Sequence, residues 1–227
     1  MKLSNTQNIL IIGATGGTGI ELIRQLSKHP SKPKVHALVR DPSKLSSDDT
    51  KLCASVLTGD ALQKADLTRA LADSKADVVI VSIGNGPKNV SQTELRTKSA
   101  QALVEALQGF PQTKVLCISS IGANDSRIKA GWGMGLMIEW YLQHILKDHT
   151  GQEKALLTAM PDRVTVVRPT GLTENKPTGH VESFGSLAQP PTVETDRADL
   201  AAWIVQQICD EKSVGGKVVN ITSVVKK

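Results

Sequence analysis

The 227-residue sequence contains few aromatic residues and few cysteines, and each shortage argues against a class of protein. Phenylalanine, tryptophan and tyrosine make up only 3% of the chain, which argues against the stacking surfaces that bind single-stranded nucleic acid. The cysteines Cys53, Cys117 and Cys209 are odd in number, far apart in sequence and surrounded by apolar residues. They predict buried free thiols rather than a disulfide framework or a metal site.

Long apolar runs and runs of like charge are also missing. No stretch approaches the length of a membrane span, and no charged-then-apolar leader opens the sequence. The net charge is +5, but the lysines and arginines are scattered and form no basic arm. We therefore expect a cytoplasmic protein that binds a small-molecule substrate and neither nucleic acid nor membranes. The sequence carries no signal of its oligomeric state.

Apolar strand-like runs alternate with helical patterns along almost the whole chain. The strand-like runs cover residues 9–12, 35–39, 53–58, 77–84, 114–120, 163–169 and 217–221. Helical spacing occupies residues 62–71, 93–107, 136–148 and 199–209. The run at 77–84 is β-branched and lacks polar alternation, which is typical of a parallel strand covered on both faces. The alternation predicts a single α/β domain with a Rossmann-type, doubly wound parallel sheet.

A glycine-rich turn joins the first predicted strand to the helix that follows it. Residues 13–19 read Gly-Ala-Thr-Gly-Gly-Thr-Gly. Glycines let the backbone approach a phosphate without a Cβ in the way, and a helix N-terminus offers unpaired N–H groups to the anion. Strand, glycine turn and helix in this order are the context that a dinucleotide-binding motif requires. The residues predicted to bind the pyrophosphate of a dinucleotide are Gly13, Thr15, Gly16, Gly17, Thr18 and Gly19.

Arg40 stands at the end of the second predicted strand, 21 residues after Gly19. An acidic residue at this place would favour the ribose of NAD, whereas a planar guanidinium suits the 2′-phosphate of NADP. Asp41 follows directly, so a solvated Arg40–Asp41 pair and an NAD site are the alternative. Ser43 and Lys44 are further candidate phosphate donors. The sequence favours NADP as the cofactor.

Two segments interrupt the alternation of strands and helices. Residues 122–135 are rich in glycine and contain Trp132, and residues 171–191 contain three prolines and three glycines. Ligands of open α/β sheets bind beyond the carboxyl ends of the strands, and both segments leave such ends. We predict that the two segments form the walls of a substrate pocket, with ordinary long surface connections as the alternative.

The motifs resemble, in their order, those of the atypical short-chain dehydrogenase/reductases. The likeness is to the small NAD(P)H-binding members, which include the flavin/biliverdin-reductase-like and NmrA-like proteins. The segments that carry the resemblance are residues 12–19, 38–44, 59–60, 118–123 and 167–169. The resemblance implies cofactor contacts beyond the glycine turn and Arg40, at Asp60, Ala61, Ile83, Gly84, Ser119, Pro169 and Leu172.

Two residues of these segments have a structural interpretation as well. Asp60, which the resemblance places at the adenine, is equally suited to capping the helix that follows it. Arg168 precedes the segment that the resemblance places beside the nicotinamide. We expect Arg168 to form an ion pair at the end of its strand rather than to bind the cofactor.

The catalytic pattern of the broader family is incomplete in this chain. Those enzymes use a serine after the fifth strand and a Tyr-x-x-x-Lys pair on the next helix, where the tyrosine gives the proton as hydride arrives. Ser120 matches the serine, and Glu153 matches the glutamate that lies four residues beyond the lysine. Counting back from Glu153 puts His149 at the lysine position and Ile145 at the tyrosine position.

Three residues remain as candidates for holding or protonating a substrate. Ser120 ends a predicted core strand on the nicotinamide side, Tyr141 lies one turn before the expected tyrosine, and His149 belongs to a type that titrates near neutral pH. The sequence predicts an NADPH-dependent oxidoreductase that passes hydride to a carbonyl, enone, quinone or flavin. The alternatives are a non-catalytic NADP(H)-binding regulator of the NmrA-like type and a cofactor-bound isomerase or epimerase.

Overall fold

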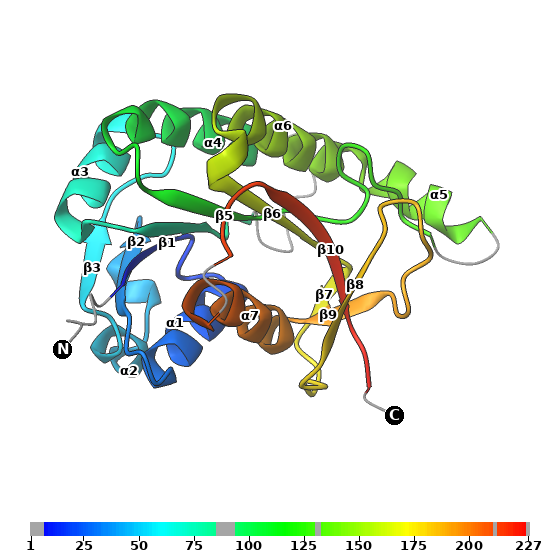
Figure 1. Ribbon diagram of the computed structural model, residues 1–227, viewed down its shortest axis with the longest axis horizontal. Coiled ribbons are helices and arrows are strands. Elements are labelled where there is room, and N and C mark those ends of the chain that lie inside the picture. Colours follow the sequence, from blue (N-terminus) through cyan, green and yellow to red (C-terminus); the bar gives the residue numbers. More distant parts are fainter. Residues whose placement is uncertain (1–6, 85–93, 130–132, 211–212, 226–227) are drawn as a thin grey trace.

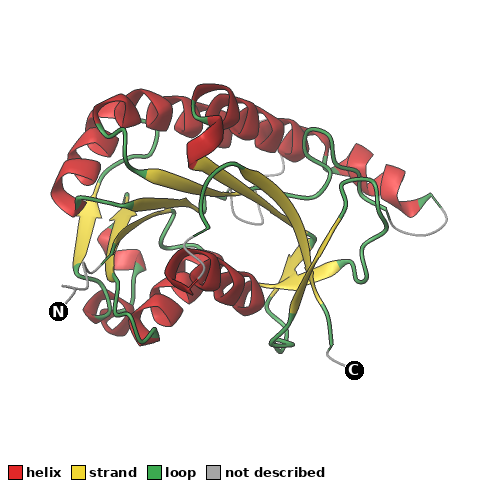
Figure 2. Cartoon of the chain, viewed as in Figure 1, coloured by secondary structure: helices red, strands yellow, loops and turns green. Residues whose placement is uncertain are grey.

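The computed structural model describes residues 7–84, 94–129, 133–210 and 213–225. In this part of the chain, helices cover both faces of a central sheet (Figures 1 and 2). The sheet has eight strands in the order β3-β2-β1-β4-β5-β6-β10-β8. In chain order these strands are β1 (Asn8–Ile12), β2 (Lys34–Val39), β3 (Ser55–Thr58), β4 (Val78–Val81), β5 (Lys114–Ile118), β6 (Val164–Pro169), β8 (Val181–Phe184) and β10 (Lys217–Ser223). All neighbouring strands are parallel except β8, which runs antiparallel to β10.

Central strand β1 shows why the strands are apolar without alternation. Ile9 and Ile11 face one hydrophobic cluster, whereas Leu10 and Ile12 face a second cluster on the other side of the sheet. All four side chains are buried, because each face of the sheet is covered by helices. The predicted Rossmann-type, doubly wound parallel sheet is confirmed.

The helices divide between the two faces of the sheet. They are α1 (Gly17–Lys28), α2 (Ser47–Lys51), α3 (Lys64–Ser74), α4 (Leu95–Ala106), α5 (Met134–Tyr141), α6 (Gln143–Ala159) and α7 (Arg197–Val205). Helices α1 and α7 pack on the face of the first cluster, and α3, α4 and α6 pack on the face of the second (Figure 1). Short 3-10 turns follow β2, α4 and α6, and a π-helical turn, Gln206–Asp210, continues α7.

The segment predicted as an irregular connection, residues 171–191, contains regular structure. Strand β7 (Gly171–Thr173) pairs with β9 (Glu194–Asp196) in a small second sheet, and β8 extends the central sheet. These short strands were not predicted, because the glycines and prolines between them interrupt the apolar pattern. These strands obtain their hydrogen bonds from partners distant in sequence, which local composition does not reveal.

The single helix predicted over residues 136–148 is two helices. Helix α5 ends at Tyr141, and α6 begins at Gln143 after Leu142, whose N–H donates to the carbonyls of Ile138 and Trp140. Glu139 fixes α5 to the preceding connection by accepting the Ile128 N–H at 2.7 Å. Helix α5 extends away from the sheet at one end of the molecule (Figure 1).

The cysteines have the environments expected from the sequence. Cys117 and Cys209 are buried free thiols, and Cys53 is a half-buried free thiol. Burial raises the pKa of the Cys53 thiol to about 11, so this group stays protonated at neutral pH. Within the described ranges, no helix combines the length and apolarity needed to cross a membrane.

Candidate functional site

The turn after β1 packs so closely against neighbouring backbone that two positions there accept only glycine. Gly13 has a φ of +86°, and a Cβ at this residue would lie 2.3 Å from the carbonyl oxygen of Ser82 at the end of β4. A Cβ on Gly19 would lie 2.5 Å from the carbonyl oxygen of Gly13. Gly13 therefore lets the β1 turn pass against the β4 end, and Gly19 lets α1 start against the turn.

The first turn of α1 has the properties of an anion site. Gly16 is its N-cap, no side chain caps it, and no acidic residue lies in the first turn. Gly16 and Gly17 are exposed, Thr15 is half-buried, and Thr18 is buried. A Cβ on Gly16 would meet nothing closer than 3.4 Å, whereas a Cβ on Gly17 would lie 2.8 Å from the Arg197 Nε. A phosphate fits this end of the helix, where the dipole favours negative charge.

Arg40 follows β2 and is exposed. The neighbouring Asp41 caps a 3-10 turn, Pro42–Lys44, by accepting the Ser43 N–H at 3.0 Å and the Ser43 hydroxyl at 2.6 Å. These bonds hold the pKa of the Asp41 carboxyl below its usual range. In the described part of the chain Arg40 forms no ion pair, so the alternative Arg40–Asp41 pair is not formed. The guanidinium is available to an anion.

The end of β4 lies beside the glycine turn, and the end of β3 lies two strands from β1, beyond β2. After β3, Asp60 accepts the Leu62 N–H at 3.0 Å and donates its own N–H to Asp66 at 2.9 Å. The next helix, α3, begins only at Lys64 with Gln63 as its N-cap, so Asp60 shapes the turn and does not cap that helix. Ala61 and Ile83 are half-buried, and Gly84 is exposed. Their placement beside an adenosine remains a prediction.

The carboxyl ends of β5 and β6 are joined by a buried network of charges. Arg168 binds Glu153 through two hydrogen bonds, from Nε to Oε1 at 2.8 Å and from Nη2 to Oε2 at 2.6 Å. Its Nη2 also pairs with Asp125 at 2.8 Å. Ser119 donates its hydroxyl to Glu153 at 2.6 Å. Arg168 is thus the structural ion pair expected from the sequence, and the Ser119 hydroxyl serves the same network.

Ser120 lies one residue further along, at the surface end of this network. It is half-buried, and its hydroxyl donates to the Ile121 carbonyl at 3.0 Å. The Ile121 N–H donates to the carbonyl of Pro169 at 3.0 Å, which ties the two strand ends together. Leu172, three residues beyond the end of β6 and within β7, is 36% exposed. Ser120 and Pro169 therefore lie at the carboxyl ends of β5 and β6, where the resemblance implies the nicotinamide, and Leu172 follows in β7.

The other two candidate catalytic residues lie in different surroundings. Tyr141 ends α5 with 64% of its surface exposed. His149 is buried in α6, where burial and then the charge of Arg96 lower its pKa to about 3. A neutral imidazole keeps one N–H but is a very weak acid at neutral pH. Neither placement favours a general acid, so Ser120 is the best placed of the three.

A second buried ion pair, which the sequence analysis did not identify, lies next to His149. Arg96 of α4 pairs with Asp148 of α6 at 3.4 Å, and Asp148 also accepts the Thr97 N–H at 2.9 Å. The Arg96 Nη2 lies 4.0 Å from the position of a Cβ on Gly84, so the guanidinium reaches the end of β4. Spacing within either helix could not indicate this pair, because its partners are 52 residues apart.

The two segments predicted to form substrate walls contact each other. The Arg127 N–H donates to the Ser186 carbonyl at 3.3 Å, and Lys129 donates to the Leu187 carbonyl. A cavity of about 530 Å³ lies between these segments and α5, lined by Arg127, Ile128, Lys129, Gly133, Gly135, Leu136, Glu139 and Gln189. Trp132, named as a wall residue from the sequence, lies outside the described residues.

Comparisons with known proteins agree with this geometry. The NAD(P)H-binding family profile matches residues 13–211, and this match confirms the resemblance predicted from the motifs. ChuY, an anaerobillin reductase from Escherichia coli O157:H7, is similar in structure, with a TM-score of 0.75, 18% identity and coverage of 96% of this chain and 98% of that one.

Two further solved structures share the fold. A short-chain dehydrogenase/reductase from Veillonella parvula DSM 2008 in complex with NADP has a TM-score of 0.73 and 15% identity, covering 96% of this chain and 94% of that one. A Rossmann-fold NAD(P)-binding family protein from Shigella flexneri has a TM-score of 0.71 and 19% identity, covering 98% of each chain. At these identities the similarity concerns the fold.

Proposed function

Because the chain belongs to the NAD(P)H-binding family, we propose that it is an NADPH-dependent oxidoreductase that reduces a small organic acceptor. The observation that carries the proposal is the β1–α1 turn, where Gly13 and Gly19 leave no room for a side chain and the N-terminus of α1 has no side-chain cap. Carbonyls, enones, quinones and flavins are the classes of compound that would accept a hydride from NADPH.

The residues of the turn would hold the pyrophosphate, and Arg40 would select the cofactor. Gly17 and Thr18 would offer backbone N–H groups to the phosphates, while the Gly16 N–H closes the turn by donating to the Gly13 carbonyl at 3.1 Å. Arg40 is exposed at the end of β2, and Asp41 is occupied by its own turn. A free guanidinium favours a 2′-phosphate over a bare ribose hydroxyl. When bound, the reduced nicotinamide supplies the hydride.

At the other end of the site, the buried network fixes the position of Ser120, which would hold the acceptor. Arg168 of β6 binds Glu153 of α6, the Ser119 hydroxyl after β5 donates to the same carboxylate, and the Ile121 N–H donates to Pro169. These bonds fix the backbone that carries Ser120. The Ser120 hydroxyl, donated to Ile121 at 3.0 Å, can turn to a substrate oxygen instead. Orientation of the acceptor next to the hydride donor then supplies most of the rate, and solvent supplies the proton.

A binding protein without turnover is the second candidate function. The observation that favours it is the placement of two of the predicted acids, both within the described residues: Tyr141 is exposed on α5, and His149 is buried and neutral. The anaerobillin reductase and the NADP complex among the structural neighbours support the reductase instead. Reduction is also compatible with an enzyme that takes its proton from water.

Fluorescence titration with NADPH and NADH tests the cofactor assignment. We expect the wild-type chain to prefer NADPH, and Arg40→Ala to weaken NADPH binding about tenfold or more with little effect on NADH. Lys98→Ala removes an exposed positive charge on α4 and is the matched control. Equal losses for both nucleotides in Arg40→Ala would contradict the 2′-phosphate assignment.

Once an acceptor has been found, turnover is measured by following NADPH oxidation. Ser120→Ala should lower kcat about tenfold while leaving the Kd for NADPH unchanged, because the hydroxyl contacts the acceptor and not the cofactor. If no member of the four acceptor classes oxidises bound NADPH, the non-catalytic binding protein becomes the better description.

A further inference from the structure

An ion pair between Glu174 and Arg197 lies against the glycine turn. The Glu174 carboxylate and the Arg197 Nε are 3.7 Å apart. A Cβ built on Gly17 would lie 2.8 Å from the Arg197 Nε and 3.1 Å from the Glu174 Oε1. Both charged groups therefore lie directly beside the first residue of α1.

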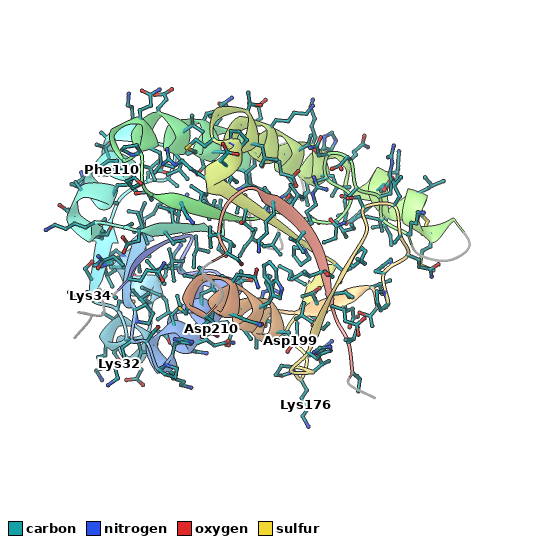
Figure 3. All side chains as sticks on the ribbon, viewed as in Figure 1. Lys32, Lys34, Phe110, Lys176, Asp199 and Asp210 are labelled. Atoms are coloured by element: carbon teal, nitrogen blue, oxygen red, sulfur yellow. The ribbon has the colours of Figure 1, made fainter. Side chains whose placement is uncertain are left out.

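The small second sheet brings the two residues together. Thr173 of β7 is in register with Asp196 of β9, so Glu174 and Arg197 are the next residues of two paired strands. The Arg197 Nη1 also donates to the Thr173 carbonyl at 3.4 Å. Asp199, labelled on α7 in Figure 3, accepts the Thr178 and Gly179 N–H groups at 3.0 and 2.9 Å. The segment after β7 is thereby fixed to α7 on the same side as the pair.

The two partners differ in how firmly they are held. The Arg197 side chain is 27% exposed, whereas that of Glu174 is 78% exposed. Exposed ion pairs contribute little free energy, and 3.7 Å is long for a charge-assisted hydrogen bond. Bonds from a guanidinium to phosphate oxygens are shorter and stronger. A phosphate at the α1 N-terminus would therefore displace Glu174 from Arg197.

We propose that Arg197 binds the pyrophosphate of the dinucleotide and that Glu174 competes with it for the arginine. This inference rests on the proposed dinucleotide site at the glycine turn. Glu174 supplies the negative charge that the first turn of α1 itself lacks, and it leaves when the dinucleotide enters. Arg197 then joins the backbone N–H groups of the turn in holding the phosphates, and Gly17 must lack a side chain to let it approach.

Calorimetric titration with two nucleotide fragments tests the proposal. ADP-ribose carries the pyrophosphate, whereas adenosine 2′-monophosphate carries only the phosphate assigned to Arg40. Arg197→Met should weaken ADP-ribose binding about tenfold or more, and Glu174→Gln should tighten it about two- to fivefold. Neither variant should change binding of adenosine 2′-monophosphate by more than about twofold, because that phosphate lies at the end of β2.

Matched controls remove charges from the same region without touching the pair. Lys176→Met removes a positive charge from the same segment, and its side chain points away from the molecule in Figure 3. Glu182→Gln removes an exposed negative charge on β8. Both controls should leave ADP-ribose binding within about twofold of wild type, since their charges are screened by solvent.

The outcomes separate this inference from the proposed function. The role of Arg197 would be overturned if both pair variants bound ADP-ribose as the wild type does, or if they lost equal affinity for both fragments. In either case, ADP-ribose binding by the wild type would still support the dinucleotide site. A wild-type chain that binds neither NADPH nor ADP-ribose would overturn both proposals. Tighter binding by Glu174→Gln cannot result from a folding defect, so this variant keeps the test decisive if Arg197→Met is unstable.

Discussion

The two ends of the candidate site are built by opposite means. At the end proposed to bind the phosphates, Gly13, Gly16 and Gly19 have no side chain, so the backbone of the β1–α1 turn would contact the dinucleotide. At the end proposed to bind the nicotinamide, Arg168 of β6 and Glu153 of α6 are a buried ion pair, which Ser119 links to β5. The first end is stabilised by close backbone packing and the second by paired charge, so the two should respond differently to substitution.

The largest effect is expected where a buried charge loses its partner. Glu153→Leu should lower the free energy of unfolding by about 3–5 kcal/mol, because it leaves the Arg168 guanidinium buried with only the exposed Asp125 to pair with. Urea unfolding measures the loss. The double variant Glu153→Leu/Arg168→Leu should recover part of it, and a double variant as unstable as the sum of two single variants would show that charge pairing is not the cause.

Substitutions in the glycine turn should separate folding from binding. Gly13→Ala should cost about 2–4 kcal/mol of unfolding free energy, since its φ is +86° and its Cβ would lie 2.3 Å from the Ser82 carbonyl. Gly16→Ala should cost less than about 1 kcal/mol, because its φ is −77°, yet it should weaken NADPH binding at least about tenfold. Thermal unfolding and fluorescence titration of both variants check this contrast.

The contrast between the two ends explains how much the sequence could predict. The glycine turn was predictable because its requirement is local: a strand, three spaced glycines and a helix start within residues 9–20. The sheet was predictable from apolar runs such as β4. The structure adds partners that are distant in the chain, including Arg96 with Asp148 and Glu174 with Arg197. Such pairs depend on topology and have no sequence spacing of their own.

Dependence on distant partners also explains why the strands within residues 171–191 were not predicted. Residues 171–191 form short strands because β9 and β10 offer open edges, and neither partner can be identified from the segment itself. The predicted helix over residues 136–148 divides at Leu142, between α5 and α6. Helical spacing continues across that break, so periodicity alone could not locate it.

A third and smaller effect, on the pH dependence of stability, is expected from His149 of α6. Its pKa in the folded chain is about 3, below the ordinary value of 6.5, so between these pH values the unfolded chain binds a proton that the folded chain does not. Stability should therefore fall with decreasing pH below about 6.5, by at most about 1.4 kcal/mol per pH unit. His149→Gln should flatten the dependence of urea unfolding between about pH 6.5 and 4.5.

Two comparisons sharpen the histidine test. His36 also has a pKa lowered by burial, so a part of the slope with the same sign should persist in His149→Gln. Carboxyl groups such as Asp49, whose pKa is lowered by the Arg24 hydrogen bond, lose their contribution only below about pH 4. An unchanged slope between these limits in His149→Gln would show that folding does not lower the pKa of His149.

The smallest effect on stability is expected in α5, which belongs to neither end of the site. Leu136 is 73% exposed and lines the cavity between the two long connections. Leu136→Gln should change the free energy of unfolding by less than about 0.5 kcal/mol, whereas Leu146→Ala, a buried change in α6, should cost about 2–3 kcal/mol. If the cavity receives the acceptor, Leu136→Gln should raise KM with little change in kcat, because it would remove apolar contact made equally in the ground and transition states. An unchanged KM would place the acceptor elsewhere along the strand ends, closer to Ser120 and Leu172.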